Sequence, residues 1–229
     1  LLRYYRDGPG EPLAYADDYA HLVWGLLELY EARFELRYLH EALELTEEMD
    51  RLFRDDEIGD FFLAGEDVER PFARQKDAED GALPSANSVA ALNLLRLADM
   101  TTRGELQDRA LDVMKARAGH LENQPAAFVH LLSGVDFELG PTRQLVLEGD
   151  RDADDTERLI REIHARFLPR TTVLFRPANG GQEELDRVCG WTPGQSADEA
   201  AQVYVCEDKV CRRPVKDPEE LADLLGKAT

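Results

Sequence analysis

Polar side chains that suit ligand binding gather in or just before the first turns of two strongly apolar segments of the sequence. Arginine and lysine bind anions, and paired carboxylates can act as general acid and base on a glycosidic or related substrate. These residue types predict a site for an anionic or hydroxyl-rich small ligand. The candidates are Asp18, Tyr19, Arg74, Lys76, Asp80, Ser85, Asn87 and Ser88, with Asp17 and Asp77 beside them.

Each candidate also has a structural interpretation. Asp17 and Ser85 are residue types that cap helix N-termini, and Asp80 could bond to a turn of its own loop. Arg74 and Lys76 stand out because lysine is scarce in this chain. They could equally pair with neighbouring carboxylates, so the residue types alone leave both roles open.

The elements that must position these residues are predicted to be helical hairpins. Apolar side chains surround nearly the whole of segment 13–33, which predicts a buried helix, whereas segment 36–53 has one acidic face and predicts an amphipathic helix. The same order returns in segments 85–100 and 105–121. A further helix is predicted over 125–139.

The two hairpins form an internal repeat with an offset of 68 residues. The offset also makes Asp17 equivalent to Ser85, so both apolar helices would begin with a capping residue. If these helices run parallel, their N-termini and positive dipole ends gather at one place, where an anionic or hydroxyl-rich ligand would bind. The offset aligns Leu26, Leu27 and Leu29 with Leu94, Leu95 and Leu97, and Ala42 and Leu43 with Ala110 and Leu111.

The spacing of apolar residues changes from a helical to a mixed strand and helix pattern after Gly140-Pro141. Short apolar runs separated by an amphipathic helix predict a parallel strand pair and a small α/β domain over 141–229, following helical hairpins over 1–140. Short β-structure is also expected at 61–63 and 71–73 in the long polar connection between the hairpins. The predicted strands are 143–148, 171–175 and 202–206, and the predicted helices are 154–167 and 218–226.

The charge of the chain limits its partners. Forty-seven acidic residues face 27 basic ones, giving a formal net charge of −20, and only five of the bases are lysines. This balance is typical of an extreme halophile, whose high salt screens the repulsion between acids; a GC-rich genome with mild acidity is the alternative. The chain lacks the basic stripe of nucleic-acid binding and an apolar run long enough to cross a membrane.

The sequence motifs predict no cofactor and no metal. Cys206 and Cys211 supply two soft ligands and Cys189 a third, one short of a structural zinc site, so free thiols or an occasional disulfide are expected. No dinucleotide or phosphate-binding loop is present. Few cysteines and no leader segment predict a cytoplasmic protein. Among the histidines, His130 is the best candidate for a functional role.

Several motifs together resemble a family that joins an N-terminal thioredoxin-like domain to an α/α toroid. That toroid is similar to those of N-acylglucosamine 2-epimerases and six-hairpin glycosidases, and the family includes the spermatogenesis-associated thioredoxin-like protein of animals. The family usually has glycine where Asp60 and Ala86 stand here. The residues that carry the resemblance are Asp18-Tyr19-Ala20, Phe53-Arg54-Asp55, Gly59-Asp60-Phe61-Phe62, Arg74-Gln75-Lys76, the stretch DGALPSANS at 80–88 and the stretch CEDKVCRRP at 206–214.

The resemblance implies that this chain is a C-terminal part of a longer protein, with a thioredoxin-like head and further toroid hairpins upstream. The expected fold is therefore mainly α, an incomplete α/α toroid followed by a small α/β segment. The first functional hypothesis is a toroid that binds or acts on a carbohydrate-like or anionic small ligand. The second is a non-catalytic scaffold or partner-binding module that serves a redox-active head. No epimerase catalytic histidines match, so no catalytic residue is carried across.

Overall fold

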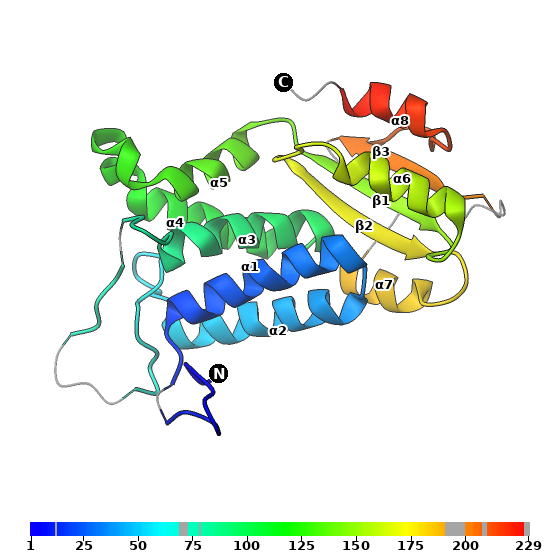
Figure 1. Cartoon of the computed structure of the whole chain (residues 1–229). Helices are drawn as coiled ribbons and strands as arrows, with labels where there is room; N and C mark the ends of the chain where they lie inside the picture. The colour runs from blue at the N-terminus through cyan, green and yellow to red at the C-terminus, as the bar shows by residue number, and fades with distance from the viewer. Residues whose placement is uncertain (12, 69–72, 78, 191–199, 208–209, 227–229) are drawn as a thin grey trace. The chain divides into compact units, whose positions relative to one another are not determined.

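The computed structural model describes residues 1–229 except 12, 69–72, 78, 191–199, 208–209 and 227–229. The chain divides into two compact units: Leu1–Ala98 with Arg103–Asp136, and Asp99–Thr102 with Phe137–Thr229. The first unit is built from helices, and the second contains a four-stranded sheet (Figure 1). The prediction of a mainly α protein with a small α/β part is therefore confirmed.

The helical unit follows the predicted hairpins closely. Helix α1 packs along α2 as an antiparallel pair, and α3 lies beside α1 (Figure 1). A 3₁₀ turn over Pro125–Ala127 separates α4 from α5. In the described part of the chain, no helix combines the length and the apolar character that a membrane span requires. The helices are α1 (Ala16–Arg33), α2 (Leu36–Phe53), α3 (Ala86–Thr101), α4 (Gly104–Asn123) and α5 (Val129–Leu139).

Burial explains why these segments are helical. Leu27 of α1 and Leu39 of α2 are fully buried, and each such side chain contributes about 1.5–3 kcal/mol to stability. The opposite side of α2 carries its exposed carboxylates, as an amphipathic helix requires. Phe34 ends α1 in the left-handed conformation, φ 58°, and its N–H donates to the Tyr30 carbonyl.

Two predicted helix starts need correction. Helix α1 begins at Ala16 rather than residue 13, and Tyr15 occupies the N-cap position expected for Asp17. The predicted helix over 125–139 is interrupted at Phe128, whose φ of −138° and ψ of 39° are not helical. The Ser85 prediction is confirmed, because its Oγ accepts the Ser88 N–H at 3.2 Å directly before α3.

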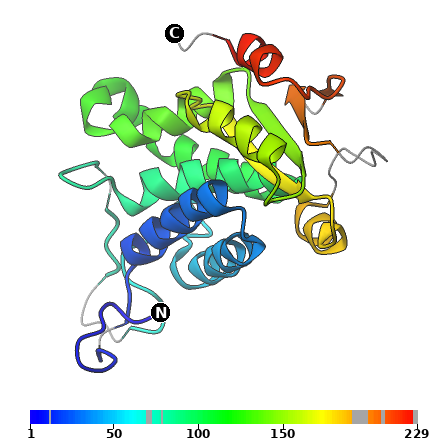
Figure 2. The same ribbon diagram turned by 45° about the vertical axis from the view of Figure 1, so that its right-hand side comes forward.

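The second unit contains a mixed sheet with strand order β2-β1-β3-β4, and Figure 2 shows α6 (Asp154–His164) in front of this sheet. The predicted parallel pair is confirmed, because β1 and β2 run parallel, and β3 then pairs antiparallel with β1. Helix α6 contacts β1 and α8, while α7 contacts β2. The elements are β1 (Arg143–Gly149), α6 (Asp154–His164), β2 (Thr171–Pro177), α7 (Gln182–Cys189), β3 (Gln202–Glu207), β4 (Val210–Cys211) and α8 (Pro218–Leu225).

The β-structure expected in the connection between α2 and α3 is reduced to one bridge. Phe61 pairs with Arg54 in an isolated antiparallel bridge, and no longer strand forms among the described residues 61–63. Of the second expected segment, residues 71 and 72 lie outside the described residues. Helix α7 and strand β4 are the elements that the sequence pattern missed.

Candidate ligand-binding site

Arg74 fixes the connection between α2 and α3 to the end of α2. Its guanidinium donates to the carbonyls of Leu52 at 2.6 Å and Ala64 at 2.8 Å. The same group lies 4.2 Å from the centre of the Phe62 ring, a cation–π distance. These bonds occupy much of the guanidinium, so the structure gives Arg74 a bracing role in the loop.

Lys76 belongs to a buried ion network that also contains Asp60. Its ammonium bonds to the carboxylates of Asp55 and Asp60, and Arg117 of α4 reaches the other Asp60 oxygen at 2.5 Å. The Asp60 side chain is only 3% exposed. The hydrogen bond from Lys76 lowers the pKa of the Asp55 carboxyl. Gly59 directly before Asp60 has a φ of 92°, a backbone conformation that glycine adopts without strain.

Asp80 connects the starts of two helices. Its Oδ1 accepts the Ser85 N–H at 2.9 Å before α3, and its Oδ2 accepts the His130 N–H at 2.8 Å in the first turn of α5. Ser85 and Ser88 are buried and bonded to each other, with their hydroxyl oxygens 3.0 Å apart. The structure thus joins Asp80, Ser85 and Ser88 by capping bonds.

The Asn87 side chain bonds to both backbone polar groups of Phe61. Its side-chain carbonyl accepts the Phe61 N–H at 2.8 Å, and its amide donates to the Phe61 carbonyl at 3.0 Å. The same amide reaches the Asp77 carbonyl at 3.2 Å. Because Asn87 is 2% exposed, these bonds satisfy a buried amide and attach the loop to α3.

The two candidates on α1 are also bonded within the protein. Asp18 accepts the Tyr15 N–H at 2.9 Å and so closes the first turn of α1. Tyr19 is 2% exposed and its ring meets Phe53 edge-on at 5.3 Å. Burial raises the pKa of the Tyr19 phenol, and a hydrogen bond to Glu48 raises it further. Tyr19 is therefore a neutral core residue at physiological pH.

Four other side chains form what we call the histidine–tryptophan cluster: Asp17, His21 and Trp24 of α1, and His130 of α5. Asp17 Oδ1 and His21 Nε2 are buried atoms with no hydrogen-bond partner among the described residues. The Trp24 ring lies 4.9 Å from the His130 ring and 6.3 Å from the His21 ring. The cluster therefore brings two imidazoles close to one indole, and two of its buried polar atoms have no partner in the described structure.

The electrostatic setting keeps His130 neutral near pH 7. Burial lowers the pKa of its imidazole, the charge of His21 lowers it further, and the nearby Asp80 carboxylate opposes both effects. A neutral imidazole offers one donor and one acceptor. His21 Nδ1 lies 2.8 Å from the Asp17 carbonyl, which leaves Nε2 as the nitrogen without a partner in the described structure.

This arrangement suits recognition of a polar ring. An aromatic face provides apolar stacking surface, and the unpartnered atoms supply hydrogen-bonding positions that favour a ligand with hydroxyl groups. The described residues contain no group of three or more His, Cys, Asp or Glu that could hold a metal. Sequence reasoning named His130 but missed its pairing with Trp24. The available signal was the spacing of Asp17, His21 and Trp24, which share one face of a helix.

Comparison with known proteins identifies relatives of this chain. No family model matches it. It is 32% identical to human spermatogenesis-associated protein 20 across 98% of this chain, and 32% identical to the rat protein of that name across 92%. An uncharacterized protein of Caenorhabditis elegans is 29% identical across 96% of the chain. The chain spans 27–30% of the length of these relatives. It is therefore a homologue of spermatogenesis-associated protein 20.

Proposed function

We propose that the helical unit binds a carbohydrate-like small ligand at the histidine–tryptophan cluster. The observation that carries this proposal is the pair of unpartnered buried atoms, Asp17 Oδ1 and His21 Nε2, on the helical face that also carries the half-buried Trp24 indole. A buried polar atom without a partner costs about 1–3 kcal/mol. Two ligand hydroxyls that donate to these two acceptors would recover that cost, while the ligand ring would stack on Trp24.

The earlier candidates take a supporting role in this proposal. Asp80 positions the first turn of α5 and therefore His130, through its bond to the His130 N–H. Asp18 closes the first turn of α1, which carries Asp17. Arg74, Lys76 and Asn87 brace the connection that leads to α3. Arg74 and Lys76 are the two cations among them, and we propose them as the side chains that contact an anionic group of the ligand.

The alternative is a scaffold within a longer α/α toroid, and the internal repeat supports it. Asn93 of α3 is 3% exposed and donates to the Ala20 carbonyl of α1, sharing a helical face with the buried Leu97. The positions equivalent to these by the 68-residue offset are Gly25 and Leu29, and both are exposed. A further hairpin packed on α1 as α1 packs on α3 would cover them. In that arrangement the chain would serve a thioredoxin-like head in the same polypeptide.

A thermal-shift measurement separates the two functions. The 229-residue chain would be titrated with D-glucose, N-acetyl-D-glucosamine and inorganic phosphate at up to about 10 mM, ten times the 1 mM dissociation constant that corresponds to about −4.1 kcal/mol. Binding predicts a saturable rise of the melting temperature with at least one sugar. His21→Ala should raise the dissociation constant for that sugar about threefold to tenfold, because it removes one hydrogen bond. The matched control is His164→Ala, on the exposed surface of α6.

An absent shift with all three probes, in a chain that melts cooperatively, would contradict ligand binding and favour the scaffold. Equal weakening by His21→Ala and His164→Ala would contradict the location of the site. A shift with phosphate but with neither sugar would replace the carbohydrate-like ligand with an anion. In that case Arg74→Ala should abolish the response.

A further inference from the structure

The second unit contains a disulfide that the proposed ligand site does not involve. Cys206 of β3 and Cys211 of β4 are directly opposite in the antiparallel ladder, with Cα atoms 3.9 Å apart, and their sulfurs are bonded. The third cysteine, Cys189, is fully buried and forms no disulfide within the described residues. We infer that Cys206–Cys211 is a reversible thiol–disulfide exchange site, whose substrate is a dithiol that can close to an unstrained cyclic disulfide and that attacks the Cys211 sulfur.

Accessibility selects the sulfur that is attacked. Cys206 is 3% exposed and lies opposite Gln144 of the central strand β1, whereas Cys211 is half-buried in the two-residue edge strand β4. A thiolate must approach the sulfur that it attacks, so access favours Cys211. Arg212 and Arg213 follow Cys211 in the chain, and their guanidinium groups pair with Glu207 at 2.9 Å and Glu220 at 2.8 Å.

The fold tolerates cleavage of this disulfide, because other bonds hold the same strands. Arg212 N–H donates to the Val205 carbonyl at 3.0 Å, and Val203 pairs with Val215 through two backbone bonds of 2.8 and 2.9 Å. Only five positions separate the two cysteines, and a short closed loop adds the least entropic stabilisation. The sulfur–sulfur bond therefore contributes little to the fold beyond what the strand pairing provides. Such a bond suits reversible chemistry better than structural support.

The exchange balances in two steps. A thiolate of the dithiol attacks Cys211 Sγ, the Cys211–Cys206 bond breaks, and Cys206 leaves as a thiolate that takes up a proton. The second thiolate of the dithiol then attacks the first dithiol sulfur, which is bonded to Cys211 Sγ in the mixed disulfide, and Cys211 leaves as a thiolate that takes up a proton. The protein disulfide gains two electrons, and the dithiol becomes a cyclic disulfide. A monothiol stops after the first step, because the adjacent Cys206 thiolate attacks the mixed disulfide and closes the bond again.

The test uses the native 229-residue chain. Dithiothreitol is added without denaturant, samples are alkylated with N-ethylmaleimide at intervals, and peptide mass mapping reports each cysteine. We expect two thiols to appear, Cys211 to be alkylated at least about tenfold faster than Cys206, and the buried Cys189 to stay unmodified as an internal control for folding. Glutathione at the same thiol concentration should leave most of the disulfide intact.

Two variants test which sulfur reacts. With glutathione disulfide, Cys206→Ser should accumulate a mixed disulfide at Cys211, whereas Cys211→Ser should form one at Cys206 at least about tenfold more slowly. The inference is overturned by equal alkylation rates at the two cysteines, or by reduction only at denaturant concentrations that also expose Cys189. It is also overturned if Cys211→Ser reacts as fast as Cys206→Ser. If either variant misfolds, labelling of Cys189 reveals it, and the rates in the wild-type chain decide.

Discussion

Trp24 and His130 lie against each other with ring centroids 4.9 Å apart and ring planes tilted by 47°. Their positions in the chain differ by more than 100 residues, so their contact joins the middle of α1 to the first turn of α5. Asp80 holds the His130 backbone from a third element, the connection between α2 and α3. The cluster is therefore a tertiary feature that depends on three separate segments.

The neutral state of His130 predicts a pH dependence of stability. Its pKa is lower in the folded protein than the value of about 6.5 expected for the unfolded chain. The unfolded state therefore binds more protons below pH 6.5, and the unfolding free energy should fall as the pH decreases from 7 toward 5. The loss is at most about 1.4 kcal/mol per pH unit, until folded His130 is protonated as well.

Urea unfolding at pH 5, 6 and 7 measures this effect. His130→Gln should flatten the slope between pH 7 and pH 5, because glutamine does not titrate there. His164→Gln, on the exposed surface of α6, should leave the slope as in the wild type. A slope that His130→Gln does not change would show that His130 is not the residue responsible.

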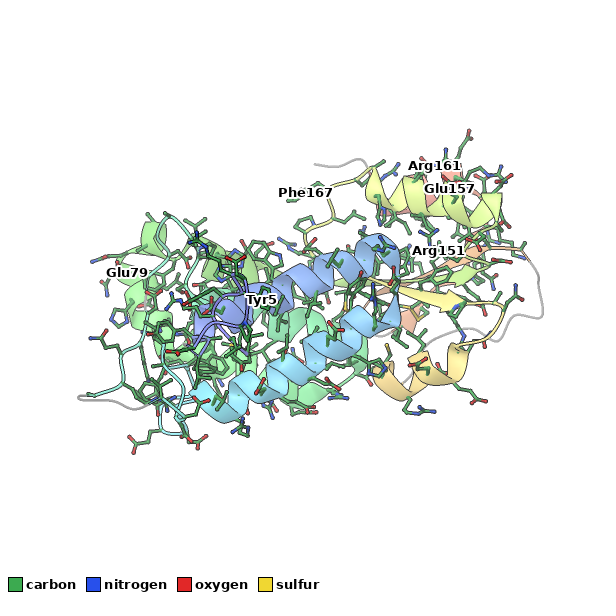
Figure 3. The ribbon with its side chains drawn as sticks, turned by 60° about the horizontal axis from the view of Figure 1, so that its bottom comes forward. Tyr5, Glu79, Arg151, Glu157, Arg161 and Phe167 are labelled. Carbon is green, nitrogen blue, oxygen red and sulfur yellow. A yellow bond between two sulfur atoms is a disulfide. The ribbon has the colours of Figure 1, made fainter. Side chains whose placement is uncertain are left out.

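The buried network around Asp60 predicts a large loss of stability on mutation. Asp60→Ala would leave Lys76 and Arg117 as buried cations without their shared carboxylate, which costs about 3–5 kcal/mol. Chemical denaturation measures the change. The matched control is Glu157→Ala in the exposed Glu157–Arg161 pair of α6, which Figure 3 labels. That variant should stay within about 0.5 kcal/mol of wild type. A similar small effect for Asp60→Ala would contradict the network.

The two bonds of Asp80 predict a coupled effect on stability and on the site. Asp80→Ala removes acceptors for the N–H groups of Ser85 and His130, and should lower the unfolding free energy by about 1–3 kcal/mol. It should also weaken any ligand response that depends on His130. Glu79→Ala, the exposed neighbour labelled in Figure 3, is the control and should change neither property. Equal behaviour of the two variants would rule out the bridging role.

The excess of acids predicts stabilisation by salt. With a net charge of −20, the unfolding free energy should rise steeply between about 0.1 M and 3 M KCl, because screening reduces the repulsion between carboxylates. Replacing the exposed Glu41 and Glu44 of α2 with lysine should reduce the slope. Urea titrations at each salt concentration measure it, and a flat dependence in the wild-type chain would contradict the halophilic interpretation.

The sequence pattern predicted the elements well, because each is set by local periodicity. The apolar surroundings of α1, the acidic face of α2 and the short apolar runs of β1 and β2 are properties of consecutive residues. Helix α7 was missed, although Gly181 and Gly190 mark its two ends. Its eight residues are too few for the apolar spacing to be distinctive.

The site was harder to predict because partners are chosen by tertiary packing. The sequence contains carboxylates in such number that nothing local distinguishes the buried Asp60 from its exposed neighbours. Most of the predicted ligand residues form hydrogen bonds within the protein, as Arg74 does with two backbone carbonyls. Trp24 and His130 carry no shared sequence signal, and only the packing of α5 near α1 brings their rings together.

Fluorescence of Trp24 tests the proposed ligand site most directly. The chain has two tryptophans, so Trp191→Phe leaves Trp24 as the only indole. Titration of this variant with D-glucose and N-acetyl-D-glucosamine should give a saturable change in Trp24 emission for at least one sugar, and His130→Ala should weaken it about threefold to tenfold. Emission that stays constant up to about 10 mM of both sugars, in a folded chain, would contradict carbohydrate binding at the histidine–tryptophan cluster.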